Sequence, residues 1–298
     1  MRQDRKERLL CGMLLLLMVS IAWLTPLRAA ELPFSQGLLF QVERDGEPVG
    51  YLFGTMHSED PRVLALPGPV ERAFVESPRL LVEVNMDGAS LLASVAAMLL
   101  DDGRELRDIL DPALYRETVA TAARLGLPEA ALRYYKPWAL AIMLSLPPSE
   151  TGLFLDLVLY RRALELNKEV AGLETIREQL DLFDSLSEED QVLLLRDTLN
   201  NFEQLPTIFQ ALLDRYLDRD LAGLVEINRQ LVGGSTEPLV ERFQAKAVDE
   251  RNRRMVERLE APLARGGVFV AVGALHLPGE QGILRLLERR GYRIVRKY

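Results

Sequence analysis

The chain has 298 residues, of which 48% are apolar, 27% charged and 7% aromatic, the balance of a folded protein rather than a disordered or fibrous one. Its 36 lysines and arginines stand against 44 aspartates and glutamates, and the net charge of -8 argues against nucleic acid as a partner. With one cysteine and two histidines, the chain cannot support thiol-based chemistry or a histidine-rich metal cluster.

The first 30 residues have the order of a secretory signal peptide. Residues 1–8 are basic, residues 9–24 are apolar and uncharged, and small residues follow near position 30. The apolar run is shorter than the roughly 20 residues of a membrane-spanning helix, which favours cleavage. Arg28 spoils a clean cleavage site, so a retained anchor is the alternative. We expect an exported protein in a bacterial periplasm, or one anchored in the inner membrane and facing the periplasm.

The mature chain begins with strand-forming segments. Residues 38–44 and 49–53 are rich in β-forming side chains, and the turn residues Asp45 and Gly46 between them predict an antiparallel hairpin. A short helix is predicted over residues 70–76, followed by a third strand over residues 79–85.

The middle of the chain is predicted to be mostly helical. Apolar residues recur at helical spacing, and Ser187 opens one of the helices with a capping signal. The expected helical segments are 89–146, with helix starts near Pro112, Pro128 and Pro137, then 152–166, 187–231, 238–249 and 250–264, with one short strand at 169–173.

Strands return at the end of the chain, at residues 268–272 and 292–296, with a helix over 281–290 between them. This order predicts an α/β fold with a mixed central sheet built from both ends of the chain and a large helical middle layer or lid. We expect one domain over residues 31–298, with a helical insertion at about 88–265.

Both histidines of the chain occupy the same local pattern. An apolar strand ends at Gly54 and is followed by His57, and another ends at Gly273 and is followed by His276. The carboxyl ends of strands are where open α/β sheets bind ligands. Either histidine alone would most simply be a structural residue, but the repeated pattern predicts one shared site.

Glu83 lies between two valines in the third predicted strand, where a carboxylate is costly unless it is paired or bound to a cation. Two imidazoles and one carboxylate at strand ends could hold a divalent metal, which would bind a water and lower its pKa. The metal could be manganese, cobalt or zinc, because the spacing does not select among them. Hydrolysis is the chemistry that this set predicts.

A series of short motifs extends over nearly the whole chain after residue 34, and through them the chain resembles the TraB/GumN family, the broad group that includes the Tiki metalloproteases. The motifs are Leu52-Phe53-Gly54-Thr55-Met56-His57, Leu81-Val82-Glu83-Val84, Lys136-Pro137-Trp138, Gly152 with Asp156, Gly172-Leu173-Glu174-Thr175 with Gln179, Arg251-Asn252, and Val272-Gly273-Ala274-Leu275-His276-Leu277-Pro278-Gly279 with Gly282, Leu286, Gly291 and Tyr292.

The resemblance implies an α/β core with a metal-assisted site and, by analogy with the Tiki branch, hydrolysis of peptide bonds. His57 and His276 would be metal ligands, and Glu83 a ligand or general base. Glu174 and the Arg251-Asn252 pair are further catalytic candidates.

The further candidates also have simpler interpretations. Glu174 could be a first-turn carboxylate favoured by a helix dipole, and the charged run around Arg251 and Asn252 could be a solvated helix face. If functional, Arg251 would clamp a substrate carboxylate or an oxyanion, and Asn252 would donate a hydrogen bond. Trp138 is expected to pack in a core, with Lys136 facing the cleft as a hypothesis.

The leading prediction is an exported metal-dependent hydrolase, acting on a peptide or protein, with a membrane partner only if the leader is retained. The alternative is a non-enzymatic haem- or metal-binding protein of the same fold, because an imidazole can also ligate haem iron. A third possibility is a scaffold whose helical middle binds a partner.

Overall fold

A computed structural model describes residues 32–147, 151–231 and 245–298. The predicted signal peptide over residues 1–30 and most of the predicted helix 238–249 lie outside the described residues. Within the described ranges, no helix is both long enough and apolar enough to cross a membrane.

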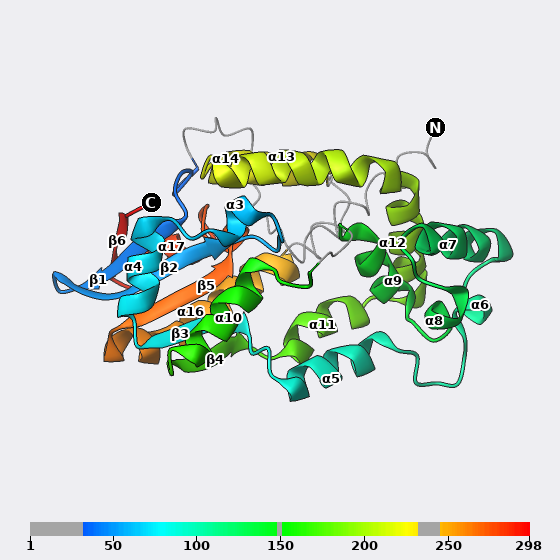
Figure 1. Ribbon diagram of the computed structural model, residues 1–298, viewed down its shortest axis with the longest axis horizontal. Coiled ribbons are helices and arrows are strands. Elements are labelled where there is room, and N and C mark those ends of the chain that lie inside the picture. The colour runs from blue at the N-terminus through cyan, green and yellow to red at the C-terminus, as the bar shows by residue number, and fades with distance from the viewer. Residues whose placement is uncertain (1–31, 148–150, 232–244) are drawn as a thin grey trace.

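Six strands form one mixed sheet in the order β4-β3-β5-β2-β1-β6 (Figure 1). β1 is antiparallel to both neighbours, β2 and β6, whereas the β2–β5, β5–β3 and β3–β4 pairs are parallel. The last strand of the chain therefore pairs with the first, which confirms the predicted α/β sheet built from both ends of the chain. The strands are β1 (Leu39–Arg44), β2 (Glu47–Thr55), β3 (Arg79–Val84), β4 (Glu169–Glu174), β5 (Val268–Gly273) and β6 (Arg293–Arg296).

The predicted hairpin joins β1 to β2. Asp45 and Gly46 have φ angles of 54° and 88°, so both central residues of the turn are left-handed, as a two-residue hairpin of type I′ requires. β2 begins two residues earlier than predicted, at Glu47, because pairing with β1 extends to the turn itself.

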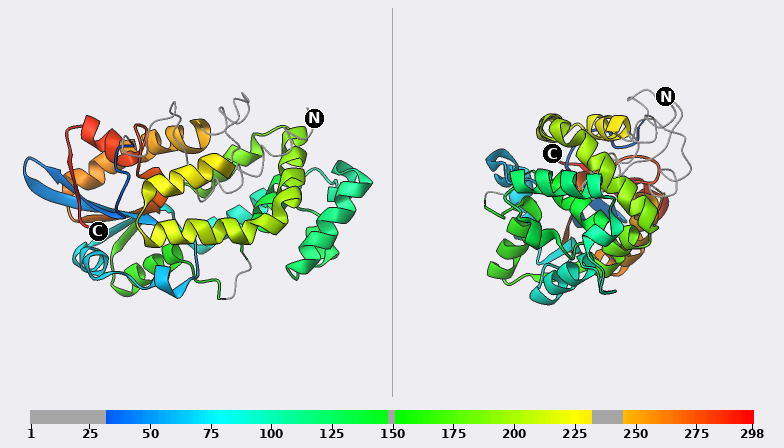
Figure 2. Two further views of the ribbon diagram at one scale, coloured as in Figure 1. Left: turned by 90° about the horizontal axis from the view of Figure 1, so that it is seen from above. Right: turned by 90° about the vertical axis from the view of Figure 1, so that its right-hand side faces the viewer.

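Helices cover both faces of the sheet (Figure 2). On one face lie α3 (Pro61–Leu64), α4 (Gly68–Glu76) and α10 (Leu155–Glu165), and on the other lie α16 (Arg251–Arg265) and α17 (Ile283–Arg289). The five residues from Val268 to Val272 are all buried, as expected for a central parallel strand enclosed between two helical layers.

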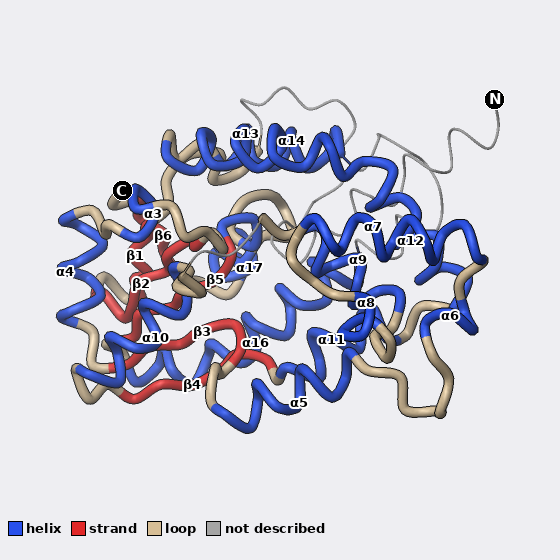
Figure 3. The backbone as a smooth tube through the Cα atoms, turned by 45° about the vertical axis from the view of Figure 1, so that its right-hand side comes forward, coloured by secondary structure: helices blue, strands red, loops and turns tan. Residues whose placement is uncertain are grey.

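The middle of the chain adds a helical body beside the sheet, at the end where the parallel strands terminate (Figures 1 and 3). It has an apolar core of its own, in which the buried ring of Trp138 stacks on Phe183 at 5.5 Å between centroids. Packing of Trp138 is thus as predicted. The helices of this body are α5 (Gly88–Met98), α6 (Leu106–Ile109), α7 (Pro112–Arg124), α8 (Glu129–Leu132), α9 (Pro137–Ser145), α11 (Ile176–Asp184) and α12 (Glu188–Asn201). The next two helices, α13 (Leu205–Leu217) and α14 (Leu221–Leu231), bury their apolar side chains in the core of the sheet instead.

Local signals placed several helix starts correctly. Pro112 and Pro137 occupy the first turns of α7 and α9, and the Ser187 side chain accepts a hydrogen bond from the backbone N–H of Asp190 at the start of α12. The apolar spacing in α5 also predicted a helix, but none of its residues is buried in the described structure.

Candidate functional site

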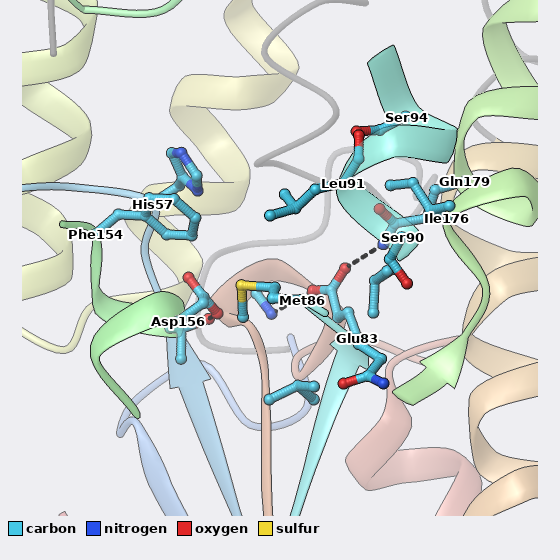
Figure 4. A pocket seen from close by; sticks show the side chains of 15 residues that line it. His57, Glu83, Met86, Ser90, Leu91, Ser94, Phe154, Asp156, Ile176 and Gln179 are labelled. Atoms are coloured by element: carbon cyan, nitrogen blue, oxygen red, sulfur yellow. Dashed lines mark hydrogen bonds between the residues drawn. The ribbon is translucent and has the colours of Figure 1, made fainter. Parts of the chain in front are cut away.

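A cavity of about 280 Å³ opens where the parallel strands end, and its walls come from both halves of the fold (Figure 4). His57, Phe154 and Asp156 lie on one side, and Glu83, Ser90 and Gln179 lie on the other. The remaining lining residues are Thr55, Val82, Val84, Asn85, Met86, Leu91, Ser94, Ile176 and Gly273.

The register between β2 and β5 brings the two Gly-x-x-His motifs side by side. Gly54 pairs with Val272 and Thr55 with Gly273. A Cβ on Gly54 would lie 3.0 Å from Cα of Ala274, inside the second motif, so this position needs glycine for close packing of the two motifs. Segments more than 200 residues apart in sequence are therefore held together by sheet pairing.

Glu83 lies beside these motifs as the last residue but one of β3, and both of its carboxylate oxygens are bonded. Oε1 accepts the backbone N–H of Gly273 at 2.6 Å, and Oε2 accepts from Arg251 at 2.7 Å and Gln179 at 3.0 Å. Burial opposes ionisation of Glu83, but the charges of His276 and Arg251 and the Gly273 N–H outweigh it and lower its pKa to about 2. Glu83 is an anion at any physiological pH.

Arg251 connects Glu83 to a second carboxylate. Its Nε donates to Glu174 at 2.8 Å, and Glu174 also accepts from Arg254 at 2.6 Å. Arg251 is 2% exposed and Glu174 3% exposed, so the ion pair between them is shielded from water. The two carboxylates and two guanidinium groups balance in charge, which a buried network requires.

Asn252 fixes the orientation of His276. Its Nδ2 donates to the carbonyl oxygen of Gln281 at 2.8 Å, which turns its Oδ1 toward Nδ1 of His276 at 2.6 Å. An amide oxygen only accepts hydrogen bonds, so Nδ1 carries the proton and Nε2 keeps its lone pair. Burial lowers the pKa of His276 to about 4, and the imidazole is neutral at pH 7.

The free Nε2 of His276 lies 3.6 Å from Oε1 of Glu83. Near pH 7 the lone pair of His276 Nε2 therefore faces an ionised carboxylate oxygen, and neither atom carries a proton that could form a hydrogen bond between them. This donor pair, with a hydrogen-bonded amide holding the far side of the imidazole, is the arrangement by which proteins ligate cations. The residues present fit a divalent metal in the chemistry of their donors.

His57 reaches the same cavity from the segment after β2. Its ring lies against Phe154, with 3.6 Å between centroids and 33° between planes. Burial lowers the pKa of His57 to about 4, so its imidazole is also neutral and able to donate a lone pair at pH 7. His57 and Glu83 both line the cavity, and the charge of Glu83 opposes the lowering of the pKa of both imidazoles by burial.

The three predicted ligands do not form a closed set. In the part of the chain that the structure describes, no group of three His, Cys, Asp or Glu side chains is close enough to hold an ion as placed. His57 and Glu83 line the cavity, whereas His276 is 3% exposed, is not among the lining residues, and lies 3.6 Å from Glu83. The pair Glu83–His276 is preformed, and His57 lies across the cavity.

The other predicted site residues lie behind this pair. The guanidinium of Arg251 is bonded to Glu83 and Glu174, and both ends of the Asn252 amide are in use within the protein. Neither residue is placed as the direct substrate contact suggested by the sequence. Lys136 pairs with Asp184 at 2.6 Å and does not line the cavity, so the hypothesis that it faces the cleft was wrong.

Asp156 was not among the predicted site residues, although it is part of a recognised motif. It lies in the first turn of α10, lines the cavity, and accepts a hydrogen bond at 2.6 Å from the buried hydroxyl of Thr55. Burial, more than the nearby charge of Glu83, raises the pKa of Asp156 to about 6. The only sequence signal for Thr55 was its position two residues before His57. The only signal for Asp156 was the motif that it shares with Gly152, which is not linked to a predicted strand.

The fold and the cavity define an α/β protein with imidazoles and carboxylates gathered at the carboxyl ends of its parallel strands, where this class places its ligands. The chain belongs to the TraB/PrgY/gumN family, which it matches over residues 38–296. The resemblance inferred from the motifs is confirmed.

Several curated proteins are similar to the chain over most of its length. Metalloprotease TIKI1 of Danio rerio is 25% identical over 86% of this chain and 62% of its own length, and its Homo sapiens counterpart is 26% identical over 86% and 61%. An uncharacterized protein of Treponema pallidum is 23% identical over 80% of this chain and 77% of its own. The chain thus spans about three fifths of the two metalloproteases. No solved structure shows significant similarity to it.

Proposed function

We propose that this protein is an exported, metal-dependent hydrolase of peptide bonds. The observation that carries the proposal is the Glu83–His276 pair, in which Asn252 fixes the imidazole tautomer so that Nε2 faces a carboxylate oxygen at 3.6 Å. The similarity to proteins named metalloproteases supports the reaction class. Glu83, His276 and His57 are the residues that would hold the ion.

A divalent metal held there would supply a Lewis acid that polarises a carbonyl group and lowers the pKa of water. The protein supplies the orientation of the ligands. Arg251 and the Gly273 N–H keep Glu83 ionised and aimed, while Glu174 and Arg254 hold Arg251 in place. Arg251, Asn252 and Glu174 therefore act through other residues, as positioning groups.

Asp156 is suited to hold a proton in this cavity. Its Oδ1 accepts from the Thr55 hydroxyl, so a proton on the carboxyl group resides on Oδ2. A pKa of about 6 leaves a useful fraction of Asp156 protonated near neutrality, as a general acid requires. In peptide hydrolysis that proton would go to the departing amine.

The first 30 residues support export as part of the same proposal, with the periplasm as the compartment and an inner-membrane anchor as the variant form. Fractionation of cells that express the full chain would test this. Recovery in the soluble periplasmic fraction, with a shortened N-terminus by mass spectrometry, is the expected result, and recovery in the cytoplasm would contradict export.

The cavity favours the hydrolase over the haem-binding alternative. Its volume of about 280 Å³ lies just below the roughly 300–1,000 Å³ of sites for drug-sized ligands, and a haem is at least as large as such a ligand. An extended peptide needs only one or two of its residues to enter such a space.

The test is metal-restored cleavage of a diverse peptide mixture. Protein stripped with a chelator is reloaded with manganese, cobalt or zinc, and the products are identified by mass spectrometry. We expect cleavage with at least one metal and a loss of about 100-fold or more in Glu83→Gln, with Glu203→Gln on the surface as the matched control. Equal cleavage by Glu83→Gln, or no cleavage together with a visible absorbance band on adding haem, would reject the hydrolase.

A further inference from the structure

α5 presents apolar side chains to solvent beside the candidate site. Leu91, Leu92 and Val95 are 59%, 75% and 51% exposed, and no residue of this helix is buried in the described structure. The helix carries no charged side chain between Gly88 and Met98. Single exposed leucines are ordinary on protein surfaces, but a run of them along one uncharged helix marks an interaction surface.

This apolar strip is continuous with the cavity. Ser90, Leu91 and Ser94 line the cavity, and Leu91 points into it from α5 (Figure 4). The strip continues on the same helix to Leu92 and Val95, outside the lining residues. A ligand that reaches Glu83 therefore meets α5 as a wall, and a longer ligand extends along the helix.

The polar groups at the inner end of the strip suit a peptide backbone. Asn85 lines the cavity, and its Nδ2 donates to Asp87 at 2.8 Å. Its Oδ1 is buried and has no hydrogen-bond partner among the described residues. An orphaned buried acceptor is costly unless a ligand satisfies it, and a peptide N–H is a donor of the right kind.

The charge of the lining side chains disfavours anionic ligands. The cavity is lined by Glu83 and Asp156 and by no lysine or arginine. Away from the proposed metal, a phosphate or an acidic side chain would find no cationic side chain of the cavity wall to pair with. A neutral or basic segment with apolar side chains is the chemistry that fits both the strip and the cavity.

We infer that α5 is the subsite that binds apolar side chains of an extended peptide substrate, with Leu91 and Leu92 as its specificity-determining residues. The inference rests on the proposed peptide hydrolysis for the nature of the ligand. It goes further in naming the substrate class, an uncharged or basic apolar segment, and the helix that selects it.

Equilibrium binding from a random pool of ten-residue peptides tests this without relying on turnover. The full protein is incubated briefly on ice with the pool, and the bound fraction is sequenced. We expect enrichment of leucine, isoleucine and phenylalanine over aspartate and glutamate. The Leu91→Ser/Leu92→Ser variant should reduce that enrichment by about tenfold or more, because two apolar contacts are lost.

The matched control is Leu164→Ser/Leu166→Ser, which removes two leucines of similar exposure, 52% and 48%, from outside the cavity. It should leave the enrichment unchanged, and both variants should keep the melting temperature of the parent. An unselective bound fraction, equal losses in the two variants, or a homodimer that only Leu91→Ser/Leu92→Ser dissociates would overturn the inference.

These outcomes separate the inference from the proposed function. Selective peptide binding by α5 without cleavage under any metal would uphold the subsite and reject the hydrolase. Metal-dependent cleavage with the same peptide preferences in Leu91→Ser/Leu92→Ser would uphold the hydrolase and reject the subsite.

Discussion

The amide oxygen of Asn252 lies 2.6 Å from Nδ1 of His276, while the amide nitrogen of the same side chain donates to the carbonyl oxygen of Gln281. Both ends of this buried amide are thus hydrogen-bonded. Because the Gln281 carbonyl, in the segment after β5, orients the amide, it also determines the tautomer of His276. A residue in a charged stretch of sequence thereby controls which imidazole nitrogen is available to a ligand.

Replacing Asn252 with alanine should weaken metal binding. The imidazole would lose the acceptor that holds its proton on Nδ1, and loss of such an outer partner typically costs about 10–100-fold in metal affinity. Competition against a chromophoric chelator measures the affinity. Asn201→Ala, which removes an amide bonded to Asp197 in α12, is the control and should bind as the parent does. An unchanged metal affinity in Asn252→Ala would show that Asn252 does not orient His276 for metal binding.

Arg251→Met should destabilise the fold strongly. Arg251 is 2% exposed and pairs with Glu83 and Glu174 at 2.7 and 2.8 Å, so its loss leaves the half-buried Glu83 without this guanidinium and the buried Glu174 with Arg254 alone. Breaking a buried pair in this way costs about 3–5 kcal/mol, which urea denaturation would measure. Arg285→Met, which breaks the pairs of the exposed Arg285 with Glu280 and Glu288, should cost at most about 1 kcal/mol. Similar losses in the two variants would show that the buried network contributes little.

Gly54→Ala should lower the melting temperature, because the new Cβ would lie 2.9 Å from Cδ1 of Leu277 and 3.0 Å from Cα of Ala274. Overpacking of this kind costs about 1–3 kcal/mol. Gly88→Ala is the matched control, since nothing lies within 4 Å of a Cβ there and alanine favours the helix that begins at Gly88. It should be neutral or slightly stabilising. A melting temperature for Gly54→Ala equal to that of Gly88→Ala would contradict the tight packing of the two motifs.

Asp156→Asn should stabilise the protein at neutral pH. The folded state raises the pKa of Asp156 from 3.8 to about 6, so the folded protein binds this proton more tightly than the unfolded chain does. The resulting stability is complete below about pH 4 and is lost as the pH rises through 6. The variant avoids that loss, and its advantage should approach about 3 kcal/mol at pH 8 and vanish near pH 4.

Urea unfolding at a series of pH values measures this advantage. Besides Asp156, the titratable groups in its surroundings are Glu83 from β3, Tyr216 from α13 and His57 in the cavity wall, and all three stay in the variant. Asp101→Asn on the exposed surface is the control for the removal of one negative charge. If the free energies of unfolding of Asp156→Asn and the parent differed by the same amount at all pH values, the pKa of Asp156 would not be raised in the folded state.

The sequence was sufficient for features that depend on local pattern. Runs of apolar residues ending at Gly54 and Gly273 located β2 and β5 and the edge of the sheet where His57 and His276 lie. Alternation around residue 83 placed Glu83 in β3. Each of these signals lies within a few residues of sequence. The parallel pairing of β2, β5 and β3 then brings the carboxyl ends of these strands to the same edge of the sheet.

Contacts between distant segments could not be anticipated in the same way. Arg251 and Asn252 lie in a run of charges that is typical of a solvated helix face, and only the approach of Glu174 and His276 makes that face buried. The apolar spacing predicted the helix α5 but not its exposure to solvent, because periodicity does not reveal whether a partner covers the apolar side.

The most direct test of the proposed metal site is the metal content of the untagged protein, since the chain has only two histidines and a histidine tag would mask them. After equilibration with zinc, manganese or cobalt and gel filtration, elemental mass spectrometry gives the ratio of metal to protein. We expect about one ion per chain in the parent and a large loss in both His57→Ala and His276→Ala. An undiminished ratio in the double variant would contradict the metal site.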